Sequence, residues 1–458
     1  MSGLLFRDAE VGGRRVDVRV RDGVITAVGE LENDGEESVH CEGAALLPGL
    51  HDHHLHLLAL AAWQRSVPCG PDLSGLVTAA PDPTGWIRGV DHHESTVGDL
   101  DAGRLDAVRR DTPVRVQHRS GALWILNSAA VRATRLAQGG HPGIERDARG
   151  EPTGRLWRAD AWLRTRLPEG PPDDLRATGI SLALLGLTSL TDATPDLDPR
   201  SLATLGNAVA SGAIPQRLHL LGAPTGHTAP GITVGPRKIV IADSSLPSPE
   251  ELTGAIEATH AAGRAVAVHC VSYEALVLLL SAFSATGVRS GDRIEHASLV
   301  PAALLPELSR RGLHVVTQPG FLRARGDDYL RDEPAPQDLY RCASLNDAGV
   351  PLTLSSDAPY GPVDPWAVMA AAVDRRTRSG EVVTAAEALT PAQALATYLT
   401  GPDLRPRTVR RGTPADLVLL DAPLDTALSR LPASPVRAVF LRGTRFTAPR
   451  RHAARSAG

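Results

Sequence analysis

The sequence predicts an α/β fold: a (β/α)8 TIM-like barrel with a smaller β domain beside it. Apolar β runs alternate with helical stretches through the middle of the chain, which is typical of parallel α/β architecture. We count eight such runs, enough to close a barrel. Hairpin patterns occur at both ends of the chain. With 458 residues, the chain is long enough for one large domain and a lesser one.

The strands of the barrel are assigned from these apolar runs. Helices fit between most of them; the segments Pro249–Ala262 and Val300–Arg311 are examples, each followed by the glycine that commonly ends a helix. The eight expected strands are Ala45–His56, Leu187–Ala193, Gln216–Ala223, Arg237–Asp243, Ala265–Cys270, Arg293–His296, His314–Gln318 and Leu352–Asp357.

The chain ends and one long gap complete the domain plan. The segment "RRVDVRVRDGVITAVGEL" alternates around the turn Asp22-Gly23, and "ADLVLLDAP" and "VRAVFLRGTRF" read as strands near the C-terminus. We expect residues 1–45 and 405–458 to form one small β-sandwich domain, because chain termini often lie close together. Residues 46–404 would form the barrel. About 130 residues separate its first two strands, so we expect an insertion at about 60–180, with a strand at Pro113–Arg119 and a helix near Asn127–Arg135.

Composition excludes several classes of partner. The formal net charge is -4 with acids and bases mixed, and no basic stripe suited to a phosphate backbone is present, so we expect no nucleic-acid partner. The apolar runs are too short to span a bilayer, and the first residues lack the pattern of a signal peptide. The four cysteines show no close pairing. The expected location is therefore the reducing cytoplasm.

The densest chemical signal is "PGLHDHHLHL", residues 48–57. Side chains alternate along a strand, so Asp52, His54 and His56 would share one face, with His51 and His53 on the other. Two imidazoles two residues apart can hold one metal ion. The simpler alternative is a histidine-rich loop that only meets water.

Further candidate ligands follow at the ends of other strands. "AVAVHC" carries His269, "DRIEHA" ends near His296, and "PLTLSSDAP" carries Asp357. A single histidine after a strand is more often structural, but four such placements on one barrel favour a site at the C-terminal ends of the strands. The set predicts a divalent metal with an open position for water. Lys238, in "GPRKIVIADSS", reads on its own as a surface lysine at the start of a strand.

The motif "PGLHDHHLH" resembles the "PGxxDxHxH" opening of the amidohydrolase superfamily, and the later His, His and Asp follow in the superfamily's order. Nearly the whole chain is similar to one branch, the long amidohydrolases related to N-substituted formamide deformylase. The matching pieces are "LWILNSAAV" (123–131), "EPTG" (151–154), "KIVIADSS" (238–245), "RIEHASLV" (293–300), "VVTQP" (315–319), "SSDAPYGPVDPW" (355–366) and "GTPADLVLLD" (412–421).

The resemblance implies roles for single residues. His54 and His56 would bind the more buried metal, and His269 and His296 a second metal or the rest of a single site. Asp357 would be both a ligand and the catalytic base. Lys238 matches a lysine that the branch carries as a carbamate, an anionic ligand able to bridge two ions. Gln318 and Tyr360 would contact the substrate.

Three departures from the branch fall on the substrate side. A histidine of the branch is replaced here by Ala122, which we place in the substrate-binding set. The branch's "HAIGDxA" reads "HCVSYEA", with Ser272 and Tyr273 in place of Gly-Asp. The acidic residue that often follows "PTG" is not evident in "RLWRADAW". The metal set is intact and the substrate pocket is altered.

These observations predict a metal-dependent amidohydrolase that cleaves a non-peptide C–N bond, in an amide or cyclic amide, by metal-activated water. The cofactor would be one or two divalent ions, with zinc the first expectation, and a carbamate on Lys238. Two alternatives remain: a deaminase or other metal-dependent reaction on the same scaffold, and a non-catalytic binding protein. The expected partner is a small-molecule substrate, with no membrane; the sequence leaves a homo-oligomer and the substrate's identity open.

Overall fold

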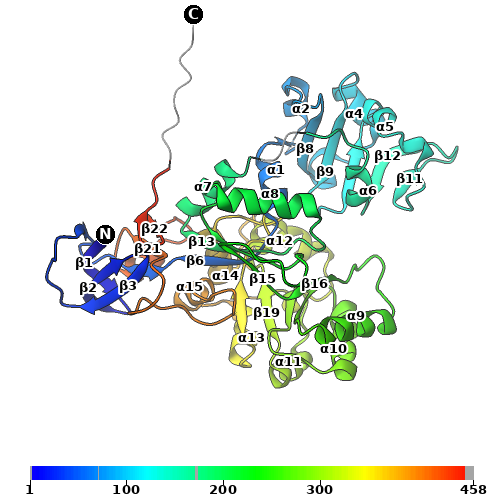
Figure 1. The fold of residues 1–458 in the computed structure, drawn as a ribbon. Coiled ribbons are helices and arrows are strands. Elements are labelled where there is room, and N and C mark those ends of the chain that lie inside the picture. The colour runs from blue at the N-terminus through cyan, green and yellow to red at the C-terminus, as the bar shows by residue number, and fades with distance from the viewer. Residues whose placement is uncertain (1–2, 71, 171–173, 449–458) are drawn as a thin grey trace, which may run out of the picture. The chain divides into compact units, whose positions relative to one another are not determined.

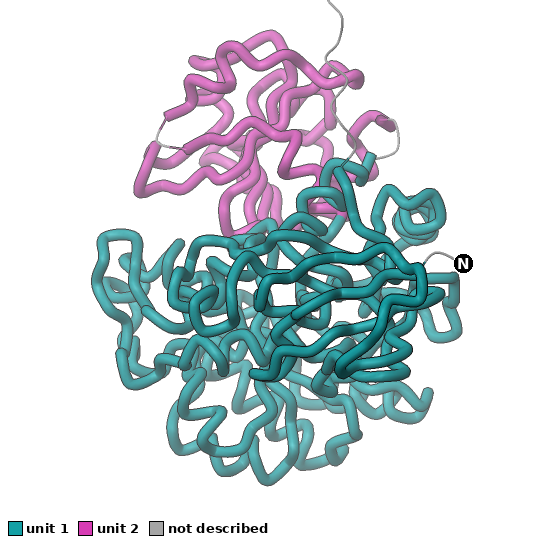
Figure 2. Tube along the Cα trace, turned by 90° about the vertical axis from the view of Figure 1, so that its left-hand side faces the viewer, with its two compact units in different colours: residues 1–57, 174–458 teal, residues 58–173 magenta. Residues whose placement is uncertain are grey.

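The structure is a computed structural model that describes residues 3–70, 72–170 and 174–448. The chain divides into two compact units, and each is described by itself. Unit 1 comprises Met1–Leu57 and Asp174–Gly458, and unit 2 comprises Leu58–Asp173 (Figure 2).

The barrel lies in unit 1 and is built from two parallel sheets (Figure 1). The first has the order β15-β14-β13-β6 and the second β16-β17-β18-β19-β20. Backbone hydrogen bonds join them at both sides: Lys238 N–H to the Leu221 carbonyl at 3.4 Å, and Asp357 N–H to the His54 carbonyl at 2.8 Å. The ring is therefore TIM-barrel-like, as predicted, although the eight expected runs did not include β15. Its strands are β6 (Leu50–Leu55), β13 (Leu187–Asp192), β14 (Arg217–Leu220), β15 (Ile232–Val234), β16 (Arg237–Val240), β17 (Val266–Cys270), β18 (Arg293–His296), β19 (His314–Thr317) and β20 (Leu352–Leu354).

Helices alternate with these strands. One hydrophobic cluster, which includes Val268, Leu276, Phe283 and Ile294, packs α9 and α10 against β17 and β18. The α-helices of unit 1 after β6 are α7 (Arg176–Leu184), α8 (Pro199–Ala210), α9 (Pro249–Ala261), α10 (Tyr273–Thr286), α11 (Leu305–Arg311), α12 (Gly320–Asp332), α13 (Cys342–Asp347), α14 (Pro365–Asp374), α15 (Pro391–Tyr398) and α16 (Leu424–Leu428).

The first expected strand, Ala45–His56, is in fact two strands. β5 (Leu46–Pro48) pairs antiparallel with β21, and β6 then enters the barrel beside β13. The break falls at Gly49, whose N–H donates to the Asp416 carbonyl. A β-carbon there would overlap the side chain of Thr188, so only glycine allows the chain to pass from one sheet to the other.

The two chain ends form two four-stranded sheets, of order β3-β2-β1-β4 and β23-β22-β21-β5. A shared core joins them, in which the rings of Phe6 and Phe440 meet edge to face at 4.7 Å. The turn at Asp22-Gly23 lies between β2 and β3, as expected. The strands not yet given are β1 (Gly3–Val11), β2 (Arg14–Arg21), β3 (Val24–Gly29), β4 (Glu37–His40), β21 (Leu417–Leu420), β22 (Val436–Leu441) and β23 (Thr444–Arg445).

Unit 2 follows β6 in the chain. Its six-stranded sheet has the order β11-β12-β10-β9-β8-β7, in which β7, β8 and β9 run parallel. The expected strand and helix are β9 and α5, with Asn127 capping the helix. The elements are α1 (Leu57–Gln64), which begins at the last residue of unit 1, β7 (Val67–Pro68), α2 (Ser74–Thr78), β8 (Ile87–His92), α3 (Glu94–Val97), α4 (Ala102–Val108), β9 (Val114–His118), β10 (Leu123–Leu126), α5 (Ser128–Ala133), β11 (Ile144–Arg146), β12 (Pro152–Trp157) and α6 (Asp160–Arg164).

Candidate metal centre

The candidate site begins on β6, where side chains alternate as the sequence predicts. The rings of His51 and His53 lie together, with centroids 4.4 Å apart, and those of His54 and His56 form a second pair at 5.4 Å. His51 is held by the hydroxyls of Ser189 and Thr191 on β13, at 2.7 and 2.9 Å. His51 is thus a buried structural histidine, and the second pair is available for chemistry.

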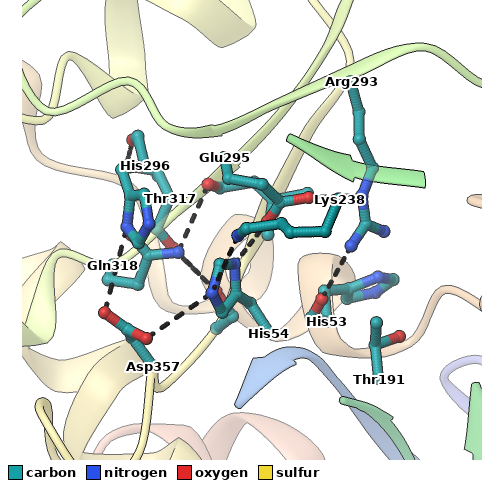
Figure 3. A network of polar contacts seen from close by, with 12 residues as sticks. His53, His54, Thr191, Lys238, Arg293, Glu295, His296, Thr317, Gln318 and Asp357 are labelled. Atoms are coloured by element: carbon teal, nitrogen blue, oxygen red, sulfur yellow. Dashed lines mark hydrogen bonds and ion pairs between the residues drawn. The ribbon is translucent and has the colours of Figure 1, made fainter. Parts of the chain in front are cut away.

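His54 and His56 converge on Asp357. The distance from Asp357 Oδ1 to His54 Nε2 is 3.5 Å and that to His56 Nε2 is 3.3 Å. These three residues form a group whose ligand atoms all lie within 4.8 Å of one another. Figure 3 shows Asp357 facing His54 across the site. Residues some 300 positions apart in the sequence meet here because both follow strands at the same end of the barrel.

The other ring nitrogen of each of these histidines has a partner. His54 Nδ1 contacts Glu295 Oε2 closely, and both side chains are fully buried. His56 Nδ1 lies 3.1 Å from Thr194 Oγ1. A histidine that donates Nδ1–H to an oxygen presents the Nε2 lone pair outward, which is how metal-binding histidines are usually oriented. Both Nε2 atoms therefore point toward Asp357 in the form that binds metal.

His296 and His269 lie beside this group. The ring of His296 is 4.8 Å from that of His54 and 4.4 Å from that of His269. His296 Nδ1 donates to Gln318 Oε1 at 2.8 Å. Gln318 in turn donates to Ser355 Oγ at 2.9 Å and to the Val316 carbonyl at 3.3 Å. The amide of Gln318 is thus engaged with the protein, and it orients His296.

The expectation that Lys238 is a surface lysine is wrong. Its exposure is 5%, and Nζ lies 3.4 Å from His54 Nε2, inside the site (Figure 3). Burial lowers the pKa of Lys238 to about 8, although the carboxylates of Glu295 and Asp357 act in the opposite direction. Lys238 is also the only lysine in the sequence, since every other one of the 48 basic residues is an arginine. A single lysine among so many arginines is a signal that can be read from the sequence. It indicates that arginine could not replace lysine at this position.

Burial governs the electrostatics of the site. It lowers the pKa of His54 and of His296 well below the ordinary value, helped by Lys238 and the neighbouring histidines, so both rings are neutral. Burial alone would raise the pKa of Glu295, but the charges of Arg293 and Lys238 outweigh it and hold the pKa below its usual range. Neutral imidazoles and charged carboxylates are the forms that bind a cation.

The backbone is strained at two of the candidate ligands. His296 has φ 71° and Asp357 has φ 52°, both in the left-handed region that non-glycine residues rarely adopt. The left-handed turn at Asp357 also explains why β20 ends at Leu354, three residues before the expected end. Such conformations cost about 1–3 kcal/mol each and persist where the surroundings impose them, frequently at functional sites.

Asp52 joins the first and last strands of the barrel. Its Oδ1 accepts the N–H groups of His54 at 3.1 Å and Ser356 at 3.2 Å, which fixes the start of the Asp357 turn against β6. Burial raises the pKa of Asp52 to about 6. Asp52 is thus a positioning residue beneath the candidate ligands.

The residues fit a divalent metal ion. Asp357 Oδ1 is buried and has no hydrogen-bond partner within the described part of the chain, although two imidazole nitrogens face it at more than 3 Å. A buried carboxylate oxygen without a partner is costly unless a cation completes its surroundings. The nitrogen and oxygen donors are those that zinc and related ions prefer.

Sequence reasoning missed the charged pair beside the ligands. Arg293 and Glu295 are both fully buried on β18; Arg293 Nε donates to Glu295 Oε1 at 2.5 Å, and a second guanidinium nitrogen donates to the His53 carbonyl. The signal was present in "RIEH": charged residues two apart in a buried strand must be paired on one face.

The remaining expected residues are placed as follows. The Tyr360 ring lies 5.7 Å from the His56 ring. Ala122 is half-buried in unit 2, where its carbonyl accepts the backbone N–H of Arg158.

Cys270 faces the hydrophobic cluster between strands and helices, not the ligands. All four cysteines are buried and free. None of the described helices is long and apolar enough to cross a membrane.

Comparison with known proteins agrees with this geometry. The sequence profile of the amidohydrolase family matches residues 37–445. The chain belongs to the amidohydrolase family. It is 26% identical to N-substituted formamide deformylase of Arthrobacter pascens, over 97% of this chain and 98% of that protein. It is also 26% identical to the putative amidohydrolase YtcJ of Bacillus subtilis (strain 168), over 87% and 88% of the two chains.

A solved structure shares the fold. It belongs to an uncharacterized metal-dependent hydrolase from Pyrococcus horikoshii, which superposes with a TM-score of 0.75 at 21% identity, over 94% of this chain and all of the other. Membership of the amidohydrolase family makes the chain a hydrolase of carbon–nitrogen bonds other than peptide bonds. The alternative of a non-catalytic binding protein is therefore set aside.

Proposed function

We propose that this amidohydrolase cleaves the C–N bond of a small amide or cyclic amide, at a metal centre held by His54, His56, His269, His296 and Asp357. The observation that carries the proposal is the convergence of two oriented imidazole Nε2 atoms on the unpartnered Asp357 Oδ1. Glu295, Thr194 and Gln318 support it, because each orients one histidine.

The protein's own groups supply the proton path. A divalent ion bound here provides a Lewis acid and lowers the pKa of water from 15.7 to about 7. Asp357 Oδ1 faces both His54 Nε2 and His56 Nε2. It would take the proton of the attacking water and deliver it to the leaving nitrogen. His54 and His296 stay neutral and cannot compete for that proton.

We also propose that Lys238 carries a carbamate and bridges two ions. A plain ammonium at this position would stand beside the dications in a dry pocket, with a repulsion of several kcal/mol. In the reaction, the neutral amine nitrogen forms a bond to the carbon of CO2 and releases one proton, which leaves an anionic –NH–COO⁻ group. Arginine cannot do this, which accounts for the single lysine of the chain lying here.

The single lysine makes this proposal easy to test. Enzyme purified with zinc and equilibrated with ¹³C-bicarbonate should show one carbamate carbonyl resonance by NMR, and Lys238→Arg should lack it. Lys238→Ala should lose one ion per chain, and short carboxylic acids should partly restore activity by replacing the missing bridge. A wild-type spectrum without the resonance, with one ion per chain, would leave a single metal held by His54, His56 and Asp357 with another histidine.

The central proposal is tested by metal content together with product analysis. Metal-free enzyme should be inactive and should recover with zinc, manganese or cobalt, while His54→Ala and His56→Ala should lose both metal and activity. N-formyl and N-acyl amines and cyclic amides form the substrate panel, with release of a carboxylate as the readout. Release of ammonia from an aminoazine or aminopurine would favour the deaminase alternative. Full activity in verified metal-free protein contradicts the whole scheme.

Two of the departures from the related branch lie after β17. Ser272 is the N-cap of α10, and its hydroxyl donates to Asp243 Oδ1 at 2.7 Å, so it is held by the fold. Tyr273 is half-exposed. We propose that this segment, with Tyr360, adapts the pocket to a substrate unlike that of the formamide deformylase.

The other expectations from the sequence stay proposals. The shared core around Phe6 and Phe440 supports a β-sandwich domain made from the two chain ends. Four buried free thiols support a reducing, cytoplasmic location. Within the insertion, the compact unit that begins at Leu58 supports the proposed domain plan.

A further inference from the structure

A second cluster of metal-binding side chains lies in unit 2, at one edge of its sheet. The parallel strands β8 and β9 end in His92 and His118, which are paired in register. His93 and Glu94 follow β8 directly, and α3 begins there. Parallel neighbouring strands bring their carboxyl ends to the same edge, which is where open α/β sheets bind ligands.

Three of these side chains converge on one point. His118 Nε2 lies 3.0 Å from Glu94 Oε2, and His93 Nε2 lies 3.7 Å from the same oxygen. One ligand atom from each of the three falls within 4.8 Å of the others. The geometry points to a second metal site, and we propose that His93, Glu94 and His118 bind one divalent transition-metal ion with the ligand preference of zinc.

Both histidines are oriented by the same local device. His93 Nδ1 lies 2.6 Å from Ser95 Oγ, and His118 Nδ1 lies 2.7 Å from Ser120 Oγ. In each case a serine two residues later fixes the ring, so that Nε2 faces Glu94. Each Nδ1 also accepts the backbone N–H of that serine, at 3.2 Å from Ser95 and 3.1 Å from Ser120. Without an ion the ring proton is therefore on Nε2, facing Glu94. Binding an ion through Nε2 moves that proton to Nδ1, where the serine hydroxyl accepts it.

His92 is the independent observation. Its side chain is fully buried, and neither ring nitrogen has a hydrogen-bond partner in the described part of unit 2. Its ring lies 5.7 Å from that of His118 and on the same side of the sheet, since the two residues are paired in parallel strands. A buried imidazole with both nitrogens unpartnered is costly. An ion at the cluster, or water bound to that ion, would give His92 a partner.

The charged residues around the cluster are few. Glu94 supplies one carboxylate beside the histidines. Arg155 is the nearby positive group, and its Nε lies 3.3 Å from Glu145 Oε2.

Zinc stoichiometry tests the proposal without reference to activity. The full chain is dialysed against a zinc buffer and analysed for metal, in wild type, His118→Ala, Glu94→Gln and the control Glu151→Gln, which changes an exposed acid of the same unit. We expect the first two variants to bind one ion fewer per chain and the control to match wild type. Circular dichroism checks that each variant is folded.

A second set of variants distinguishes this cluster from the barrel centre, because two ligands of the barrel centre are removed first. In a His54→Ala/Asp357→Ala chain, one zinc ion should remain, and adding His118→Ala should remove it. Crystals soaked in zinc should show an anomalous peak between His93 and His118. Equal zinc content in wild type and His118→Ala, or a peak only at the barrel centre, would overturn the proposal and leave the proposed hydrolase function untouched.

Discussion

Three histidines of the candidate barrel centre each have a different partner at Nδ1. His54 has a carboxylate, His56 a hydroxyl and His296 an amide carbonyl. Partners of this kind fix the tautomer and the ring angle, and their loss commonly weakens metal binding by about 10–100-fold. The ligand types were readable from sequence, but their partners come from other strands and leave no local pattern.

Thr194 allows the weakest of these partners to be tested. Thr194→Val removes the hydroxyl 3.1 Å from His56 Nδ1 and keeps the shape of the side chain. We expect zinc affinity, measured by competition with a chelating dye, to fall by about 10-fold or more, while the fold is retained. Thr194→Ser keeps a hydroxyl and should retain most of the affinity. Equal affinity in all three proteins would show that Thr194 does not orient His56.

Cys270 allows the register of β17 to be tested. It follows His269 directly, so its side chain points to the opposite face, into the cluster of aliphatic side chains. Burial raises the pKa of this thiol, so it stays protonated. Cys270→Ala should keep the full metal content and most of the activity, with a modest loss of stability. Loss of metal in a folded Cys270→Ala protein would make the thiol a ligand and the register wrong.

The elements were more predictable than their ends. Runs such as His314–Gln318 were found by their apolar pattern, and β19 covers four of those five residues. The split of the first strand at Gly49 could not be foreseen, since it depends on Thr188 from a distant segment. The early end of β20 accompanies the left-handed backbone of Asp357, a conformation that non-glycine residues rarely adopt and that the local sequence does not reveal.

The start of α9 is held by a capping box. Ser248 caps α9 by accepting the N–H of Glu251, and the Glu251 side chain accepts the N–H of Ser248 in return. Ser248→Ala should lower the free energy of unfolding by about 1 kcal/mol, measured by chemical denaturation. Glu257→Gln changes an exposed residue in the middle of the same helix and should be nearly neutral. If the two variants lose the same stability, the capping box is not what holds the start of α9.

At the scale of the molecule, each of the two candidate metal sites is formed by residues from several separate segments. The barrel centre takes residues from β6, β16, β17, β18 and the turn after β20, and the cluster of unit 2 takes residues from β8, β9 and α3. The histidines and Asp357 of the barrel set could be proposed from sequence because each lies at or just after the end of an apolar run, whereas Lys238 lies near the start of β16. The second cluster was missed because His93 caps, and Glu94 begins, a helix of only four residues, which has no recognisable sequence pattern.

The stability of the whole fold also depends on buried histidines that are neutral. His314 is the clearest case outside the candidate metal centre. It lies at the start of β19, with Nε2 3.1 Å from Thr353 Oγ1 on β20. Burial, together with the charge of Arg293, lowers the pKa of His314 to about 3. In the unfolded chain the pKa returns to about 6.5. The unfolded state therefore binds more protons below pH 6.5, so the stabilisation is complete above that pH and is lost as the pH falls toward 3.

The size of this effect can be measured with one variant. At pH 5, we expect the titration of His314 to lower the free energy of unfolding by about 2 kcal/mol relative to neutral pH, since each pH unit below 6.5 contributes about 1.4 kcal/mol. His314→Gln has no such titration. Denaturation of both proteins at about pH 7.5 and pH 5, with chelator present so that metal loss does not contribute, should show a smaller acid loss in the variant. Identical pH dependence would mean that His314 becomes protonated in the folded state at little cost, with β19 and β20 opening around it.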